Sequence, residues 1–220
     1  DKSDLEMKAC AFDSGAEAEI LVDRCDVSYD AKPTGMDDLK FVVIQQWHER
    51  IKILSQKGIN QADIKIPYYT GDNGEKIEDA KAETFNLDEQ GNVVITPVDK
   101  KQIYFQKVDK DETDLVISMP NVKVGSVIEY QYTKISDNYF RIPTWYFQTD
   151  IPSRYSYLQI KVPEMFNYTT EMFCSLPLDI NSSDSYTQNF IGGYSAKGTM
   201  RTFAMKNISA LRDEPYMNSE

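Results

Sequence analysis

His48 is the only histidine in the chain, and it decides which nucleophilic mechanisms the sequence allows. A serine or cysteine nucleophile needs a base beside it, and histidine is the usual base. His48 lies on the polar side of an alternating segment, between Trp47 and Glu49, and no G-x-S-x-G elbow occurs in the sequence. We therefore interpret His48 as a surface or strand-edge residue, and we expect no catalytic residue in this chain.

Metal and cofactor sites have little support in the sequence. The chain has three dispersed cysteines, Cys10, Cys25 and Cys174. They are too few and too scattered for a zinc site or a disulfide framework. The weak candidates for a cation site are three aspartates in one stretch, Asp109, Asp111 and Asp114. They lack the glycine and glutamate spacing of an EF-hand loop, so we expect a solvated loop, and a second polar cluster over 179–184 is interpreted in the same way. No glycine-rich phosphate loop occurs, and the sequence indicates no cofactor.

Aromatic side chains are the best candidates for binding. The candidates are Tyr139, Trp145, Tyr146, Tyr155 and Tyr157. Rings of this kind stack on sugars or anchor a protein partner. Alternating aromatic residues also fill the core between two sheets, and we favour that interpretation for most of them. The two tyrosines at 155 and 157 alternate with aliphatic residues, so we expect them on an outer face or at a second interface.

The elements that would position these residues are strands. From Phe41 to Ile53 the odd positions are mostly apolar and the even positions mostly polar, which is the period of a half-buried strand. Similar segments recur about every ten residues along the chain, with turn residues such as Gly71 to Gly74 between them. The best helix signal lies over 5–18 and is weak. The sequence predicts an all-β fold, an antiparallel two-sheet β-sandwich with at most one or two short helices.

Charge and chain length exclude several classes of protein. The chain has 220 residues and a formal net charge of -11. A nucleic-acid binder needs a basic surface, so we expect no nucleic-acid partner. Aliphatic runs are far shorter than the ~18 residues that span a bilayer, so we expect no membrane insertion. Residues 1–220 are predicted to form one large β domain, with a division into two lobes near 138–152 left open.

Four segments together resemble a known family. They are Trp47 to Leu54, Pro120 to Tyr130, Trp145 to Ser156 and Lys206 to Tyr216. In this order and spacing, the chain resembles the N-terminal β domain of unknown function that precedes a transglutaminase-like domain in exported proteins of Gram-negative bacteria. The resemblance covers about residues 10 to 217. It implies that a papain-like catalytic module follows the segment that ends Glu-Pro-Tyr, and that none of the three cysteines is its nucleophile.

The resemblance also implies a location and a role. It implies export to the periplasm or cell surface, with a signal peptide outside this sequence. We expect a non-catalytic accessory domain that positions the downstream transglutaminase-like, protease-like module or its substrate. Arg50 and Lys52 alternate with apolar residues and are predicted to face solvent, where they could dock that module or a ligand. The alternatives are a carbohydrate- or peptide-binding module that contacts an envelope protein or glycan and, least favoured, a hydrolase with acidic catalysts.

Overall fold

The computed structural model describes residues 1–33, 39–72, 74–140, 142, 144–173, 176–190 and 195–212. Cys174 and the end of the fourth family segment, from 213 onward, lie outside the described residues. The helices are α1 (Lys2–Glu6) and the short 3-10 helices η1 (Lys57–Ala62) and η2 (Lys100–Gln102). The strands are β1 (Ala18–Pro33), β2 (Leu39–Ile53), β3 (Asp63–Tyr69), β4 (Glu75–Leu87), β5 (Val93–Pro97), β6 (Ile103–Lys107), β7 (Glu112–Ser118), β8 (Val127–Ser136), β9 (Ser153–Pro163), β10 (Ile180–Asn189) and β11 (Ser195–Ile208).

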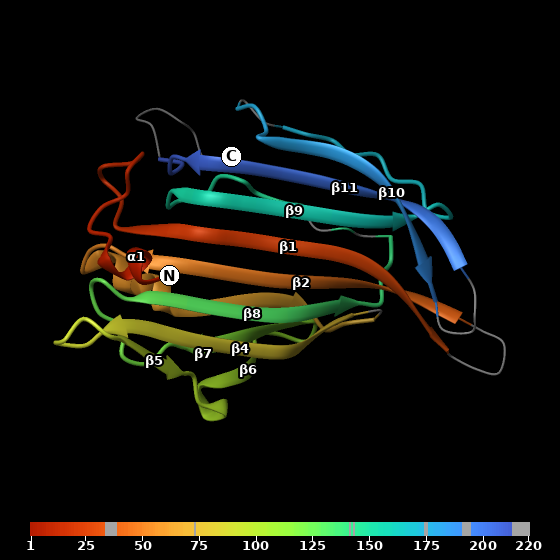
Figure 1. Ribbon diagram of the computed structural model, residues 1–220. Coiled ribbons are helices and arrows are strands. Elements are labelled where there is room, and N and C mark those ends of the chain that lie inside the picture. The colour runs from red at the N-terminus through yellow and green to blue at the C-terminus, as the bar shows by residue number, and fades with distance from the viewer. Residues whose placement is uncertain are drawn as a thin grey trace.

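The strands form two sheets, so the prediction of a mostly β chain with few short helices is confirmed. The large sheet has eight strands in the order β10-β11-β9-β1-β2-β8-β4-β5, and the small sheet has three in the order β3-β7-β6 (Figure 1). The alternation predicted for β2 is present, because Val43, Ile51 and Ile53 are buried. The face of the large sheet that carries Trp47, Tyr132 and Leu158 is called the inner face below, and the opposite face the outer face.

One strand pair corrects the prediction of purely antiparallel sheets. β1 and β9 are parallel, with Ile20 opposite Ser153 and Val27 opposite Ile160. The reason is the connection 137–152, which crosses β2 and β1 on its way from β8 to β9. A parallel neighbour requires a crossover of a dozen or more residues, whereas the local turn signals in the sequence report only hairpins.

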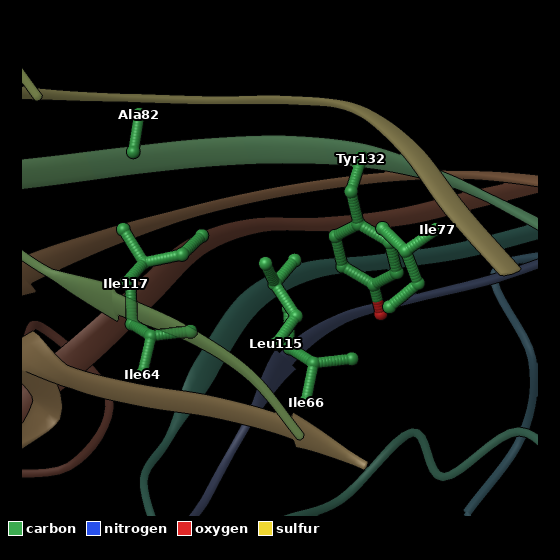
Figure 2. Packing of buried hydrophobic residues seen from close by; sticks show 7 residues of the cluster. All are labelled: Ile64, Ile66, Ile77, Ala82, Leu115, Ile117 and Tyr132. Atoms are coloured by element: carbon green, nitrogen blue, oxygen red, sulfur yellow. The ribbon is translucent and has the colours of Figure 1, made fainter. Parts of the chain in front are cut away.

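The small sheet packs on one half of the inner face. Ile64 and Ile66 of β3 and Leu115 and Ile117 of β7 form one buried cluster with side chains of β4 and β8. Figure 2 shows these four aliphatic side chains opposite Ile77, Ala82 and Tyr132. Leu115 and Ile117 are fully buried, so a regular second layer closes this half.

The N-terminal helix is shorter and earlier than the sequence signal over 5–18 indicated. α1 begins after the capping residue Asp1, whose side chain accepts a hydrogen bond from the Ser3 amide, and it ends before Met7. Leu5 is its buried residue, and it packs with Leu21 and Val127 on the outer face. No helix among the residues described above is long and apolar enough to cross a membrane.

Candidate functional site

The predicted solvent-facing role of Lys52 is wrong. Lys52 is fully buried, because α1 covers this part of the outer face. Its ammonium group donates hydrogen bonds to the carbonyl oxygens of Leu5, at 2.8 Å, and Gly125, at 2.6 Å. Burial lowers the pKa of Lys52 to about 8. This lysine therefore holds the N-terminal segment on the sheet and is not available to a partner.

Arg50 is also committed to contacts within the chain. Its Nη1 lies 3.0 Å from Glu129 Oε2, and its Nη2 lies 3.6 Å from Asp4 Oδ2. The other oxygen of Glu129 lies 2.7 Å from His48 Nε2. His48 is thus a half-exposed partner of a strand carboxylate on the outer face, in agreement with its interpretation as a surface residue. The prediction that Arg50 faces solvent for docking is wrong for the same reason as for Lys52.

The three aspartates that were weak candidates for a cation site lie in a turn and at the start of β7. Asp109 Oδ1 accepts hydrogen bonds from the backbone amides of Asp111, at 2.8 Å, and Glu112, at 2.9 Å. Asp114 lies in β7, where it pairs with Pro67 and Gln106. Within the described residues, no group of three or more histidine, cysteine or acidic side chains could hold a metal ion.

Tyr155 and Tyr157 lie on the outer face of β9. Their rings stack with centroids 6.0 Å apart, and the Arg24 guanidinium lies 4.9 Å from the centroid of the Tyr157 ring. Leu158, the next residue, packs in the cluster on the inner face. The alternation therefore separates these tyrosines from the other aromatic candidates.

The remaining aromatic candidates gather over the half of the inner face that the small sheet does not cover. The described residues of the loops between β8 and β9 and between β9 and β10 lie on β1, β9 and β11 there. They leave a cavity of about 870 Å³, called the aromatic groove below. Its floor includes Leu158 and Phe203. Among the large apolar side chains that line it, the most exposed are aromatic: Phe140 and Tyr146 at 71% and Phe173 at 93%.

Trp145 and Tyr139 are structural supports of the aromatic groove. Trp145 Nε1 donates a hydrogen bond to Ser156 Oγ at 3.0 Å, and its ring centroid lies 5.3 Å from that of Trp47. The Tyr139 carbonyl accepts hydrogen bonds from the hydroxyl groups of Tyr29 and Tyr168. Both residues are half-buried in the same cluster, so the favoured core interpretation is confirmed for them. Tyr146 is the predicted residue whose ring is left free.

The sequence analysis missed a pair of acidic residues between the two halves of the inner face. Asp23 of β1 lies opposite Glu49 of β2, and the Tyr130 hydroxyl donates a hydrogen bond to Glu49. Burial, and then the charge of Glu49, raise the pKa of Asp23 to about 8, and burial also raises the pKa of Glu49. A signal was present, because Glu49 occupies an apolar position of the alternating pattern of β2.

Comparisons with known proteins agree with this architecture. A crystal structure of a candidate protease from Parabacteroides distasonis superimposes with a TM-score of 0.58 at 14% sequence identity. The match covers 93% of this chain and 38% of that protein, so the chain spans less than half of its neighbour's length, and at this identity the likeness concerns the fold alone. The comparison with curated proteins gives no match. The model of a family described as a domain of unknown function, DUF3857, matches residues 44–189, and the chain therefore belongs to the DUF3857 family.

Proposed function

We propose that this chain is a non-catalytic interaction domain that binds a polypeptide in the aromatic groove. The observation that carries the proposal is the exposure of Phe140, Tyr146 and Phe173 around a cavity of about 870 Å³. Aromatic side chains that stand free beside a preformed cavity are typical anchors of protein recognition. Exposed apolar surface of this kind marks interaction sites.

The wider role is that of an accessory domain in a longer exported protein with a transglutaminase-like, protease-like module. The resemblance of the four sequence segments supports this role, as does the fold shared with 38% of a candidate protease. The domain would position that module or its substrate in the periplasm or at the cell surface. We also propose that residues 1–220 act as one domain. In this domain the two sheets are the layers of a β-sandwich.

A carbohydrate ligand is the second candidate, because Tyr146 and Phe173 present free rings at the rim of a cavity that also contains Arg201, Glu164 and Asn167. Sugars bind to such combinations of a flat apolar ring and polar side chains. The polypeptide is favoured because the groove is lined mainly by apolar side chains over several strands and loops.

The test immobilises this chain and measures its binding to the separately expressed downstream module, to envelope peptides and to envelope glycans. We expect a peptide or the module to bind, and Tyr146→Ser with Phe173→Ser to weaken binding at least about tenfold, as for anchor residues. The matched control is Val93→Ser with Ile95→Ser, since these apolar side chains are exposed at 43% and 53% on β5. Glycan binding alone would replace the proposal by the second candidate. Turnover of a peptide, ester or glycoside that one substitution abolishes would overturn the non-catalytic role.

A further inference from the structure

A second cavity, of about 700 Å³, lies beside the aromatic groove. Ile142, Thr144 and Tyr146 line both cavities, so the two share one wall. The rest of the second cavity is formed by the end of β3, the turn before β4, the β6–β7 hairpin and β8. We call it the acidic cavity because of the side chains described next.

Carboxylates dominate the charge of the acidic cavity. Five acidic residues line it against one basic residue: Asp72, Glu75, Asp109, Asp111, Glu112 and Lys134. Lys134 Nζ lies 3.8 Å from Glu75 Oε1, and Asp109 caps its own turn. Asp72 and Glu112 are exposed, and within the part of the chain that the structure describes their carboxylates have no ion-pair partner. The cavity therefore keeps a negative charge that a cationic side chain would neutralise.

Gln45 adds a hydrogen-bond donor at the wall of the acidic cavity. This residue is 1% exposed, and its Oε1 accepts a hydrogen bond from Trp47 Nε1 at 3.2 Å. Because an indole nitrogen only donates, the atom that faces it must be the amide oxygen, which leaves the NH₂ group of Gln45 for another acceptor. An amide NH₂ group at the wall of a cavity suits the carbonyl oxygen of a bound polypeptide.

We propose that the aromatic groove and the acidic cavity form one site for an extended polypeptide in which a lysine or arginine lies near an aromatic or large aliphatic side chain. The apolar side chain lies in the aromatic groove, and the cation lies among Asp72, Glu112 and the rings of Tyr68 and Tyr69, which also line the acidic cavity. The partner is a separate basic protein, in keeping with the net charge of -11 on this chain. This inference rests on the proposed function and specifies its partner.

The test uses three synthetic peptides of equal length, labelled with fluorescein, and the intact chain. One peptide combines phenylalanine with lysine, one phenylalanine with glutamate, and one serine with lysine. Fluorescence anisotropy at low and at moderate salt gives the affinities. We expect the phenylalanine–lysine peptide to bind at least about tenfold more tightly than either of the others, and added salt to weaken this binding.

Two double variants test whether the carboxylates of the acidic cavity attract the lysine of the peptide. Asp72→Asn with Glu112→Gln should weaken binding of the phenylalanine–lysine peptide about threefold to tenfold and reduce its salt dependence. The control is Glu83→Gln with Asp184→Asn, which removes the same charge from exposed positions on the outer face. Equal weakening in both double variants would overturn the inference, because it would show attraction by net charge alone.

Two binding results distinguish a failure of this inference from a failure of the proposed function. If the phenylalanine–glutamate peptide binds as tightly as the phenylalanine–lysine peptide, and Tyr146→Ser with Phe173→Ser abolishes both, the inference fails while the proposed function stands. If the serine–lysine peptide binds best and the aromatic substitutions have no effect, the shared site is wrong and the aromatic groove loses its proposed role.

Discussion

The two halves of the inner face have the same sheet as a floor and different covers. Over β4 and β8, the small sheet places Ile64, Leu115 and Ile117 against the floor and buries them almost completely. Over β1, β9 and β11, loops cover the sheet, and the aromatic groove stays open. Two pleated layers interlock along whole strands, whereas loops of irregular geometry contact the sheet only at their larger side chains. The closed half contributes most to stability, and the open half is where we propose binding.

The boundary between the two halves of the inner face combines aromatic side chains with a pair of acidic residues. Trp47 packs against the clusters of both halves, with its ring centroid 5.9 Å from that of Tyr132 and 5.3 Å from that of Trp145. Beside it on the same strand lies Glu49, with Asp23 opposite. Acidic side chains in this position cost stability, because burial penalises their charged forms.

The largest effect is expected in the closed half. Leu115→Ala should lower the free energy of unfolding by about 3 kcal/mol, since the side chain is fully buried and the interlocked layers cannot collapse around the void. Urea unfolding measures the change. The control Val124→Ala removes an apolar side chain that is 48% exposed and should cost less than about 0.5 kcal/mol. A loss below about 1 kcal/mol for Leu115→Ala would mean that the closed half is loosely packed.

The packing of α1 on the outer face is tested by Lys52→Met. The substitution keeps most of the apolar stem and leaves the carbonyl groups of Leu5 and Gly125 without their donor, so we expect a loss of about 2 kcal/mol. Hydrogen exchange should become faster over residues 1–7. Lys57→Met is the control, because Lys57 is 82% exposed and pairs only with Glu17. Unchanged exchange in the N-terminal segment would show that Lys52 does not hold it.

The acidic pair at the boundary can be tested through the pH dependence of the free energy of unfolding. Asp23 keeps its proton in the folded chain up to a pKa of about 8, whereas the unfolded chain loses it near the ordinary aspartate pKa of 3.8. Stability should therefore fall as the pH rises from about 4 to about 8. Asp23→Asn removes the part of this dependence that Asp23 causes and leaves the part that Glu49 causes. We expect a gain of about 2 kcal/mol at pH 8, less than full linkage would give because the Asp23 side chain keeps some contact with solvent.

Thermal unfolding at pH 4 and at pH 8 measures the effect of Asp23→Asn. The variant and the parent should have similar midpoints at pH 4 and should diverge as the pH rises. A variant that is less stable than the parent at pH 8 would show that Asp23 carries its charge in the folded chain and that a partner stabilises this charge.

The smallest effect on stability is expected at the rim of the aromatic groove. Tyr146→Ser should change the free energy of unfolding by less than about 0.5 kcal/mol, because the side chain is 71% exposed. The same substitution should weaken binding of the phenylalanine–lysine peptide. Stability and peptide affinity should both be measured for each variant. Leu115→Ala is expected to lower stability and leave the affinity of the folded protein unchanged. A large loss of stability for Tyr146→Ser would place this ring in the core.

Local pattern predicted most of the strands, but it missed β1, and it failed where distant segments meet. The alternation of β2 was visible in its residue pattern. The parallel pair of β1 and β9 was not readable, because no local signal reports a crossover. Lys52 was misassigned for a related reason: alternation gives the face of a strand, but not the segment that later covers that face.

The candidate site was predictable only in its residue types. The sequence singled out Tyr139, Trp145 and Tyr146 together, and the structure divides them into two supports and one free ring. That division depends on the path of the loop between β8 and β9. The acidic cavity joins residues from β3, the β6–β7 hairpin and β8, so its charge emerges only when the two sheets are placed together.

The parallel pairing of β1 and β9 has a consequence for synthesis on the ribosome. β1 can pair with β2 as soon as both have emerged, but its other edge waits for Ser153 and the residues after it. At ~5–20 residues per second, that edge stays open for on the order of ten seconds. An open edge strand is a template for pairing with another chain. Three aspartates along β1, Asp23, Asp26 and Asp30, repel a second copy of the same strand during this interval.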